Sequence, residues 1–162
     1  MSEVLLVAAS TAFDDYRLYS AYFCRPNKTF RPVSHVAFYS GEVEPLIPKI
    51  LDIIDELELS EEAIERCTLQ TSLHRRVLLA IVEGMRAHSS SWRGRRVKAI
   101  LLSSHSAQDT VKLPWPIRND LHTESGGTKP LVQGFRYIPL EAFIEHPRTT
   151  TELLSIAAAK RK

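Results

Sequence analysis

The stretch just after Trp115 concentrates side chains that could perform acid–base chemistry. Arg118, Asp120 and His122 alternate along five positions. A carboxylate near an imidazole can act as general base and acid, or bind a metal together with a more distant ligand. No second His/Asp cluster with convincing spacing completes such a site, and no cofactor or metal is indicated. These three residues are the candidate catalytic set of a hydrolytic or metal-assisted enzyme, next to an irregular loop over 119–130 that could cover a substrate.

Three other groupings contain reactive residue types but lack the spacing that their chemistry requires. The segment 103–109 holds Ser, His and Asp at the end of an apolar run, without the Gly-x-Ser-x-Gly turn that presents a nucleophile. The segment 125–129, Ser-Gly-Gly-Thr-Lys, lacks the spacing of a phosphate loop. Asp14 and Asp15 are neighbouring carboxylates without further ligands at diagnostic spacing. We expect polar turns in all three places.

Basic residues lie among aromatic residues in two segments of the chain. Between positions 16 and 36 there are four bases and no acid, and the loop over 89–98 places a tryptophan beside four cations. Proteins that bind single-stranded nucleic acid use guanidinium groups for phosphates and aromatic rings for stacked bases. The candidate nucleic-acid-binding residues are Arg17, Tyr19, Tyr22, Arg25, Lys28, Arg31, Trp92, Arg93, Arg95, Arg96 and Lys98.

Charge is segregated along the middle of the chain, although the formal net charge is only +2. Residues 42–65 contain nine acids and a single lysine, whereas residues 74–98 contain seven Lys or Arg residues and a single acid. A basic face of this kind can recruit a polyanion. Two alternatives stay open: the opposite charges pair inside one fold, or they pair between subunits of a homo-oligomer.

Periodic patterns predict the elements that position these residues. Strands are expected over 4–9, 17–24, 33–39, 97–103, 110–114 and 132–139 from their apolar or β-branched runs. Helices are expected over 73–88, from an apolar stripe, over 140–144 and over 149–159. Ser60 is expected to cap a further helix that runs to about Leu69. The stretch 119–130 has no periodicity and is expected to form an exposed, mobile loop.

The segment 46–59 is ambiguous between helix and strand. Its apolar residues recur at helical spacing, which favours a helix, with Pro48 tolerated in the first turn. However, Glu56 to Leu59 alternates between acidic and apolar residues as a strand does. We expect a helix here.

Length and composition indicate one α+β domain over residues 1–162. The apolar share of 44% and charged share of 25% are ordinary for a globular protein and exclude disorder. We expect a mainly antiparallel sheet, made of an N-terminal meander and C-terminal strands and packed by three to five helices. Lys160–Lys162 is expected to be a frayed basic tail. Cys24 and Cys67, isolated from each other, are expected to be reduced thiols.

The apolar runs are far shorter than the roughly 20 residues that span a bilayer, and the N-terminus lacks a basic leader. We therefore expect a cytoplasmic protein with no membrane partner. The leading hypothesis for its function is a small nucleic-acid-associated binding or accessory domain. The alternatives are the enzyme with a site at Arg118, Asp120 and His122, and a structural or oligomerising interaction protein.

Overall fold

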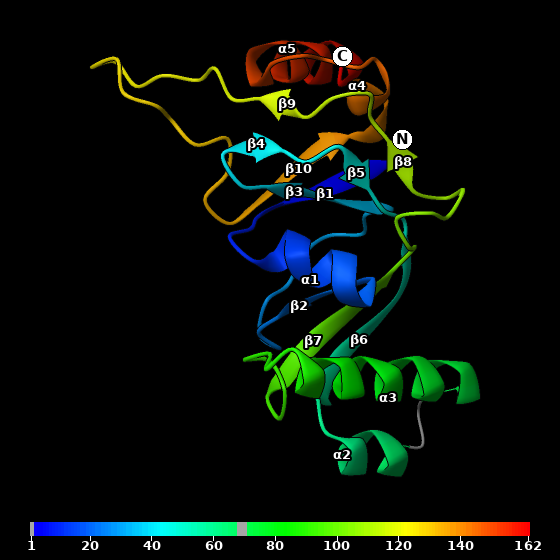
Figure 1. The fold of residues 1–162 in the computed structure, drawn as a ribbon. Coiled ribbons are helices and arrows are strands. Elements are labelled where there is room, and N and C mark those ends of the chain that lie inside the picture. The colour runs from blue at the N-terminus through cyan, green and yellow to red at the C-terminus, as the bar shows by residue number, and fades with distance from the viewer. Residues whose placement is uncertain (1, 68–70) are drawn as a thin grey trace. The chain divides into compact units, whose positions relative to one another are not determined.

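The structure, a computed structural model, describes residues 2–67 and 71–162. The chain divides into two units (Figure 1). Unit 1 contains the residues up to Asp14 together with 31–50 and 103–162, and unit 2 contains 15–30 and 51–102. Each unit is therefore assembled from segments that are not contiguous in the sequence. The expectation of a single domain stays a prediction.

Unit 1 is built on a five-stranded sheet whose strands lie in the order β10-β1-β3-β4-β9. The apolar N-terminal run forms β1 (Glu3–Ala8), which pairs in parallel with β3 (His35–Tyr39) and antiparallel with β10 (Phe135–Pro139). The short strands β4 (Glu42–Val43) and β9 (Ile117–Arg118) extend the sheet in antiparallel pairs. A further antiparallel pair joins β5 (Leu46–Ile47) to β8 (Val111–Lys112).

Two helices near the C-terminus pack on the core of unit 1. They are α4 (Leu140–Ile144) and α5 (Thr150–Lys160), and they supply Phe143 and Leu153 to the same buried cluster that contains Val4 and Leu6 of β1. Their positions confirm the helices expected over 140–144 and 149–159. Beyond α5, Arg161 caps the helix and contacts Glu3 and the carbonyl of Tyr137.

Unit 2 contains a three-stranded sheet in the order β2-β7-β6, formed by β2 (Ala21–Cys24), β7 (Arg96–Leu102) and β6 (Ile50–Glu58). Its helices are α2 (Glu61–Arg66), capped by Ser60, and α3 (Ser72–Ala87), capped by Thr71. The apolar stripe of α3, including Leu78, Val82 and Met85, packs in one buried cluster with strand residues such as Phe23 and Val97. The expected end of the Ser60-capped helix near Leu69 lies outside the described residues.

Two of the predicted elements are wrong. Residues 17–19 belong to the helix α1 (Ala12–Tyr19), because Tyr16 and Tyr19, three positions apart, are both buried on one helical face. The segment 46–59 forms β5 and β6 rather than a helix. The alternation near its end prevails there, since Leu57 and Leu59 join the core of unit 2 while Glu56 is exposed.

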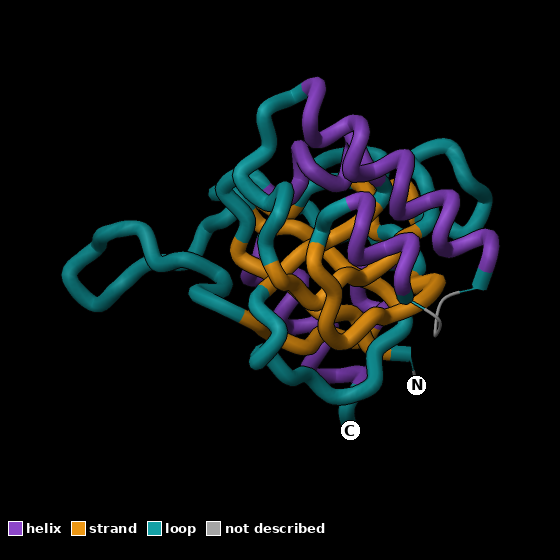
Figure 2. The backbone as a smooth tube through the Cα atoms, turned by 90° about the horizontal axis from the view of Figure 1, so that it is seen from below, coloured by secondary structure: helices purple, strands orange, loops and turns teal. Residues whose placement is uncertain are grey.

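The α+β class, with mainly antiparallel pairing and five helices in the described part of the chain, is confirmed. Figure 2 distinguishes the helices, in purple, from the strands, in orange. One detail differs: in an antiparallel meander the strand over 17–24 would lie between β1 and β3, but β1 and β3 pair directly in parallel, and β2 lies in the other sheet. Among the described residues, no helix combines the length and apolar character needed to cross a membrane.

Candidate nucleic-acid interface

The register of unit 2 brings the two basic segments of the sequence to the same end of its sheet. Strand β2 runs antiparallel to β7, with Cys24 opposite Lys98. Because β2 ends at Cys24, the following turn over 25–28 lies where β7 begins, at Arg96. The turn over 89–95 leads directly into that first residue of β7. Bases that lie some 70 positions apart in the sequence are therefore close in space.

Lys98 holds the turn over 25–28 in place. Its residue exposure is only 7%, and its Nζ donates a hydrogen bond of 2.5 Å to the carbonyl of Lys28. The same Nζ lies 5.3 Å from the centroid of the Phe30 ring and 3.9 Å from Asp55 Oδ1. Lys98, predicted as a phosphate contact, is thus a buried anchor of the basic turn and presents almost no surface to a ligand.

Five basic side chains at this end of the sheet are exposed: Arg25, Lys28, Arg93, Arg95 and Arg96. We refer to these five residues as the basic end. Among the described residues, no ion pair engages the side chains of Arg25, Lys28 or Arg93. Arg96 approaches Glu56 at 3.8 Å, but both groups are largely in solvent, where such pairs contribute little.

Trp92 lies half-buried beside the basic end. Its ring packs against Phe23 with a centroid separation of 6.2 Å, and the guanidinium of Arg95 lies over it, 4.7 Å from the centroid. Trp92 therefore belongs partly to the core, and one of its faces is occupied. The planar guanidinium of Arg95 is itself a surface on which a base can stack.

The aromatic residues of the first basic segment contribute to the core instead of to a surface. Tyr19 packs against Phe23 and meets the edge of His88, and Tyr22 is buried so far that desolvation raises the pKa of its hydroxyl. Arg17 is exposed on α1, outside any strand. Arg31 belongs to unit 1, where its guanidinium lies 4.1 Å from the centroid of Tyr137 and 3.0 Å from Glu3. Within the part of the chain that the structure describes, Tyr19 and Tyr22 are therefore core residues and do not form the stacking platform predicted for this segment.

The acidic segment pairs with the basic one within unit 2. Four contacts join them: Asp52 to His74 at 3.1 Å, Asp55 to Lys98 at 3.9 Å, Glu56 to Arg96 at 3.8 Å, and Glu61 to Arg86 at 2.9 Å. Pairing inside the fold, one of the alternatives left open by the charge pattern, thus accounts for part of the segregation. Of the basic end, Arg96 takes part in this pairing through its weak contact with Glu56, whereas Arg25, Lys28, Arg93 and Arg95 form no ion pair within the described residues.

The candidate catalytic residues are not brought together. The Asp120 carboxylate accepts hydrogen bonds of 2.9 Å from the Thr151 N–H and from the Thr150 hydroxyl, at the start of α5. The bond from the Thr151 N–H is the largest of the effects that lower the pKa of Asp120 to about 2. Arg118 is exposed on β9 opposite Glu42, and His122 is exposed opposite Thr128. No hydrogen bond or ion pair joins the three side chains in the described part of the chain.

The loop over 119–130 extends away from the five-stranded sheet of unit 1 (Figures 1 and 2). Its two arms are joined by the bridge between His122 and Thr128 and by a bond from the Thr123 N–H to the Gly127 carbonyl. This confirms an exposed loop but adds a hairpin-like pairing that the sequence pattern does not predict. Within the described residues, no group of three or more His, Cys, Asp or Glu is arranged to hold a metal ion.

A buried polar cluster in unit 1 has no counterpart in the sequence analysis. The ring Nδ1 of His35 lies 2.7 Å from the Ser34 hydroxyl, and the residue is nearly buried on β3. Desolvation, helped by the charge of Lys49, lowers the pKa of His35, whereas the carbonyl and carboxylate of Asp109 act in the opposite direction. Ser34 directly precedes β3, which begins at His35 and is otherwise apolar, so the local sequence gives no signal of this contact.

No protein-family model matches the chain, and no curated protein matches it either. Among solved structures, the chain is similar to the crystal structure of a mutant of an ASCH protein from Zymomonas mobilis, with a TM-score of 0.46 and 12% identity over 88% of this chain and 92% of that one. The crystal structure of ASCH from the same organism gives a TM-score of 0.41 and 12% identity over 94% of both chains. At this level the likeness carries no residue role or activity over to this chain.

Proposed function

We propose that this protein is a nucleic-acid-associated binding or accessory domain that contacts a single strand through the basic end. The observation that supports this proposal is the register of β2 against β7, which gathers exposed cations from two distant segments around Trp92. Arginine and lysine side chains without an internal partner keep their charge available for phosphates.

Different residues of the basic end would bind phosphates and stack on bases. Arg25, Lys28 and Arg93, which have no ion pair among the described residues, would bind phosphates. The guanidinium of Arg95, held flat over Trp92, would stack on a base. If the three phosphates bound by Arg25, Lys28 and Arg93 were neutralised on a single strand, the logarithm of the affinity would fall with that of the salt concentration with a slope of about −2.1. That slope corresponds to a loss of roughly 20-fold between about 50 and 200 mM salt.

The test is fluorescence anisotropy of labelled single- and double-stranded DNA and RNA oligonucleotides, titrated with the full chain at these two salt concentrations. The double variant Arg95→Glu/Arg96→Glu should abolish binding. The matched control is Arg66→Glu/Arg76→Glu, which changes the net charge equally at exposed positions of α2 and α3. This control should retain most of the affinity and of the salt dependence.

Two results would contradict the proposal. One is weak binding that does not change between the two salt concentrations. The other is an equal loss of affinity in both double variants, because that would reflect the net charge of the protein and not the basic end.

A further inference from the structure

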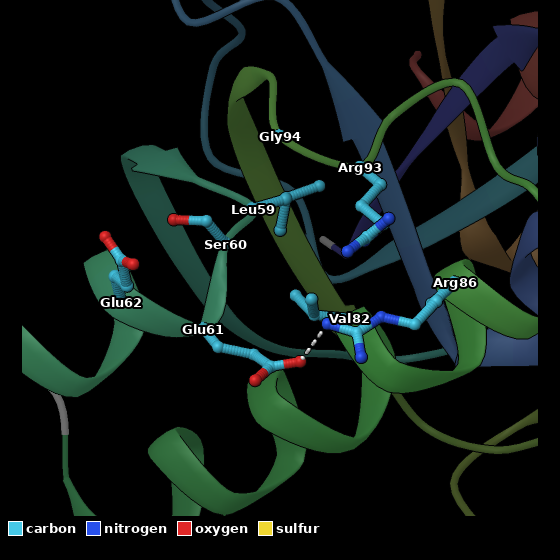
Figure 3. A pocket seen from close by; sticks show the side chains of 8 residues that line it. All are labelled: Leu59, Ser60, Glu61, Glu62, Val82, Arg86, Arg93 and Gly94. Atoms are coloured by element: carbon cyan, nitrogen blue, oxygen red, sulfur yellow. Dashed lines mark hydrogen bonds and ion pairs between the residues drawn. The ribbon is translucent and has the colours of Figure 1, made fainter.

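We propose that unit 2 contains a second site, a pocket for a small organic anion that carries a compact apolar group. The pocket has a volume of about 350 Å³ and lies where the end of β6, the start of α2, the middle of α3 and the turn before β7 meet (Figure 3). Its lining residues are Leu59, Ser60, Glu61, Glu62, Val82, Arg86, Arg93 and Gly94.

The sequence places two guanidinium groups at this pocket from different elements. Arg86 comes from the last turn of α3, and its Nη2 pairs with Glu61 Oε1 of α2 at 2.9 Å. Arg93 comes from the turn that follows α3, and Figure 3 shows its side chain reaching down toward Val82 on the same side of the pocket as Arg86. Leu59 and Val82, both almost fully buried, form the base beneath these side chains.

Two carboxylates also line the pocket: Glu61 is paired with Arg86, and the Glu62 side chain lies across the pocket from Arg93 (Figure 3). Arg93 is the group that points to an anion. A guanidinium keeps its charge at any physiological pH, and no hydrogen bond or ion pair to this side chain is present in the described residues. Its planar donors match the oxygens of a carboxylate or a phosphate. Arg86 uses part of its donor set on Glu61, in a pair that is about half exposed, so it retains N–H groups for a second acceptor.

The shape of the pocket limits the rest of the ligand. Its volume is near the lower end of the range for small-molecule sites, which suits one ring or a short branched chain. The methylene stems of the arginines, above Leu59 and Val82, offer apolar surface while their charged heads stay near water. Gly94, with a φ of 82°, allows the tight turn, and a Cβ there would meet nothing within 4 Å, so the pocket mouth is open at this point. The ligand class is therefore a phosphate monoester or carboxylate joined to a small apolar group.

The probe for the test is phenyl phosphate, titrated into the ¹⁵N-labelled full chain and followed by amide chemical shifts. Inorganic phosphate and benzyl alcohol serve as the anionic and apolar halves of the probe. We expect saturable shifts at Leu59–Glu62 and Arg93–Gly94, with phenyl phosphate at least about tenfold tighter than either half, since contacts to both halves add.

Two single variants separate the pocket from its surroundings. Arg93→Gln should weaken phenyl phosphate about tenfold, the loss expected for a hydrogen bond to a charged group. Arg76→Gln removes an exposed charge on α3 that lies outside the basic end and does not line the pocket, and should leave the affinity unchanged. The amide spectra report in the same experiment that both variants are folded.

The proposal is overturned if phenyl phosphate binds no tighter than inorganic phosphate, if the shifts lie away from the pocket, or if Arg76→Gln weakens binding as much as Arg93→Gln. This inference goes beyond the proposed function, and the two can fail separately. If Arg95→Glu/Arg96→Glu lost oligonucleotide binding but bound phenyl phosphate normally, both the proposed function and the pocket would be supported. If the original protein bound phenyl phosphate normally but bound no oligonucleotide, the pocket would be supported and the proposed function contradicted.

Discussion

Lys98 illustrates how one residue type can have two opposite roles. A lysine beside several arginines in the sequence indicates a phosphate contact, but here the ammonium lies within unit 2 and donates to the Lys28 carbonyl. Its charge, with that of Lys28, lowers the pKa of the nearby Cys24 thiol, although burial has the larger effect and raises it. The residue therefore acts on ligand binding only through the turn that it anchors.

The variant Lys98→Met keeps the apolar stem of the side chain and removes the ammonium. We expect a loss of about 1.5–3 kcal/mol in the free energy of unfolding, because the Lys28 carbonyl loses a charged donor. The salt dependence of oligonucleotide binding should keep its slope. Urea unfolding and the anisotropy assay measure the two quantities. A slope reduced by about one unit at unchanged stability would instead indicate a direct phosphate contact.

His35 makes the stability of unit 1 depend on pH. Its pKa is lowered in the folded state, so the unfolded chain, with a histidine pKa of about 6.5, takes up the proton more readily. The stability that the neutral ring contributes is complete above that unfolded-state value, and it is lost as the pH falls through the lower folded-state pKa. Protonation thus favours unfolding between these two values.

As the pH falls from about 7.5 to about 5, we expect the free energy of unfolding to decrease less in the variant His35→Gln than in the original protein. Urea unfolding at several pH values measures this difference. His122→Gln, at an exposed position of the loop over 119–130, is the control and should follow the original pH dependence. If all three proteins showed the same dependence, burial of His35 would have no part in it.

At the scale of elements, the stripe on α3 was predictable because a helix of this length repeats its apolar positions several times. β6 was not. Its apolar residues fit helical spacing as well as strand spacing. The segment forms a strand because β7, about 40 positions later in the chain, supplies its hydrogen-bonding partner. The helix α1 shows the reverse error: tyrosines favour strands locally, yet Tyr16 and Tyr19 share one buried helical face.

The close approach of α3 to α1 rests on Gly84. A Cβ at this position would lie 3.3 Å from Cε1 of Tyr19, whose ring is buried in the core of unit 2. Gly84→Val should therefore destabilise the protein by about 1–3 kcal/mol through overpacking, although valine is the better helix former. Ala80→Val, at an exposed site of the same helix, should cost only roughly 0.5 kcal/mol. Chemical denaturation compares the two, and equal effects would exclude the Tyr19 contact as the cause.

At the scale of the whole molecule, the chain passes between its two units after Asp14, Phe30, Ile50 and Leu102. Each unit has its own apolar cluster, yet neither is a continuous segment that one cut could release. If one unit unfolded, the ends of the chain segments that form the other unit would no longer be held near each other. We therefore propose that the two units fold as one cooperative domain.

The two tryptophans report on this cooperativity, since Trp92 lies in unit 2 and Trp115 in unit 1. Trp92→Phe leaves a reporter of unit 1 only, and Trp115→Phe leaves a reporter of unit 2 only. In each variant we expect the fluorescence midpoint in urea to coincide with the midpoint measured by far-ultraviolet circular dichroism. Separate midpoints in either variant would show that the units unfold independently.

What the sequence alone determined is local: the α+β class, the apolar stripe of α3, the two C-terminal helices with the Thr149 cap of α5, and the buried strands β1, β3 and β7. These follow from periodicity and capping within a few residues. The tertiary structure decided the parallel pairing of β1 with β3, the placement of the turn over 25–28 beside the start of β7, the hydrogen bonds from the start of α5 to the Asp120 carboxylate, and the pocket lined by Arg86 and Arg93. Each of these features depends on which distant segments pack together. That packing is determined by the burial of whole apolar faces of helices and sheets, and no short stretch of sequence specifies both partners.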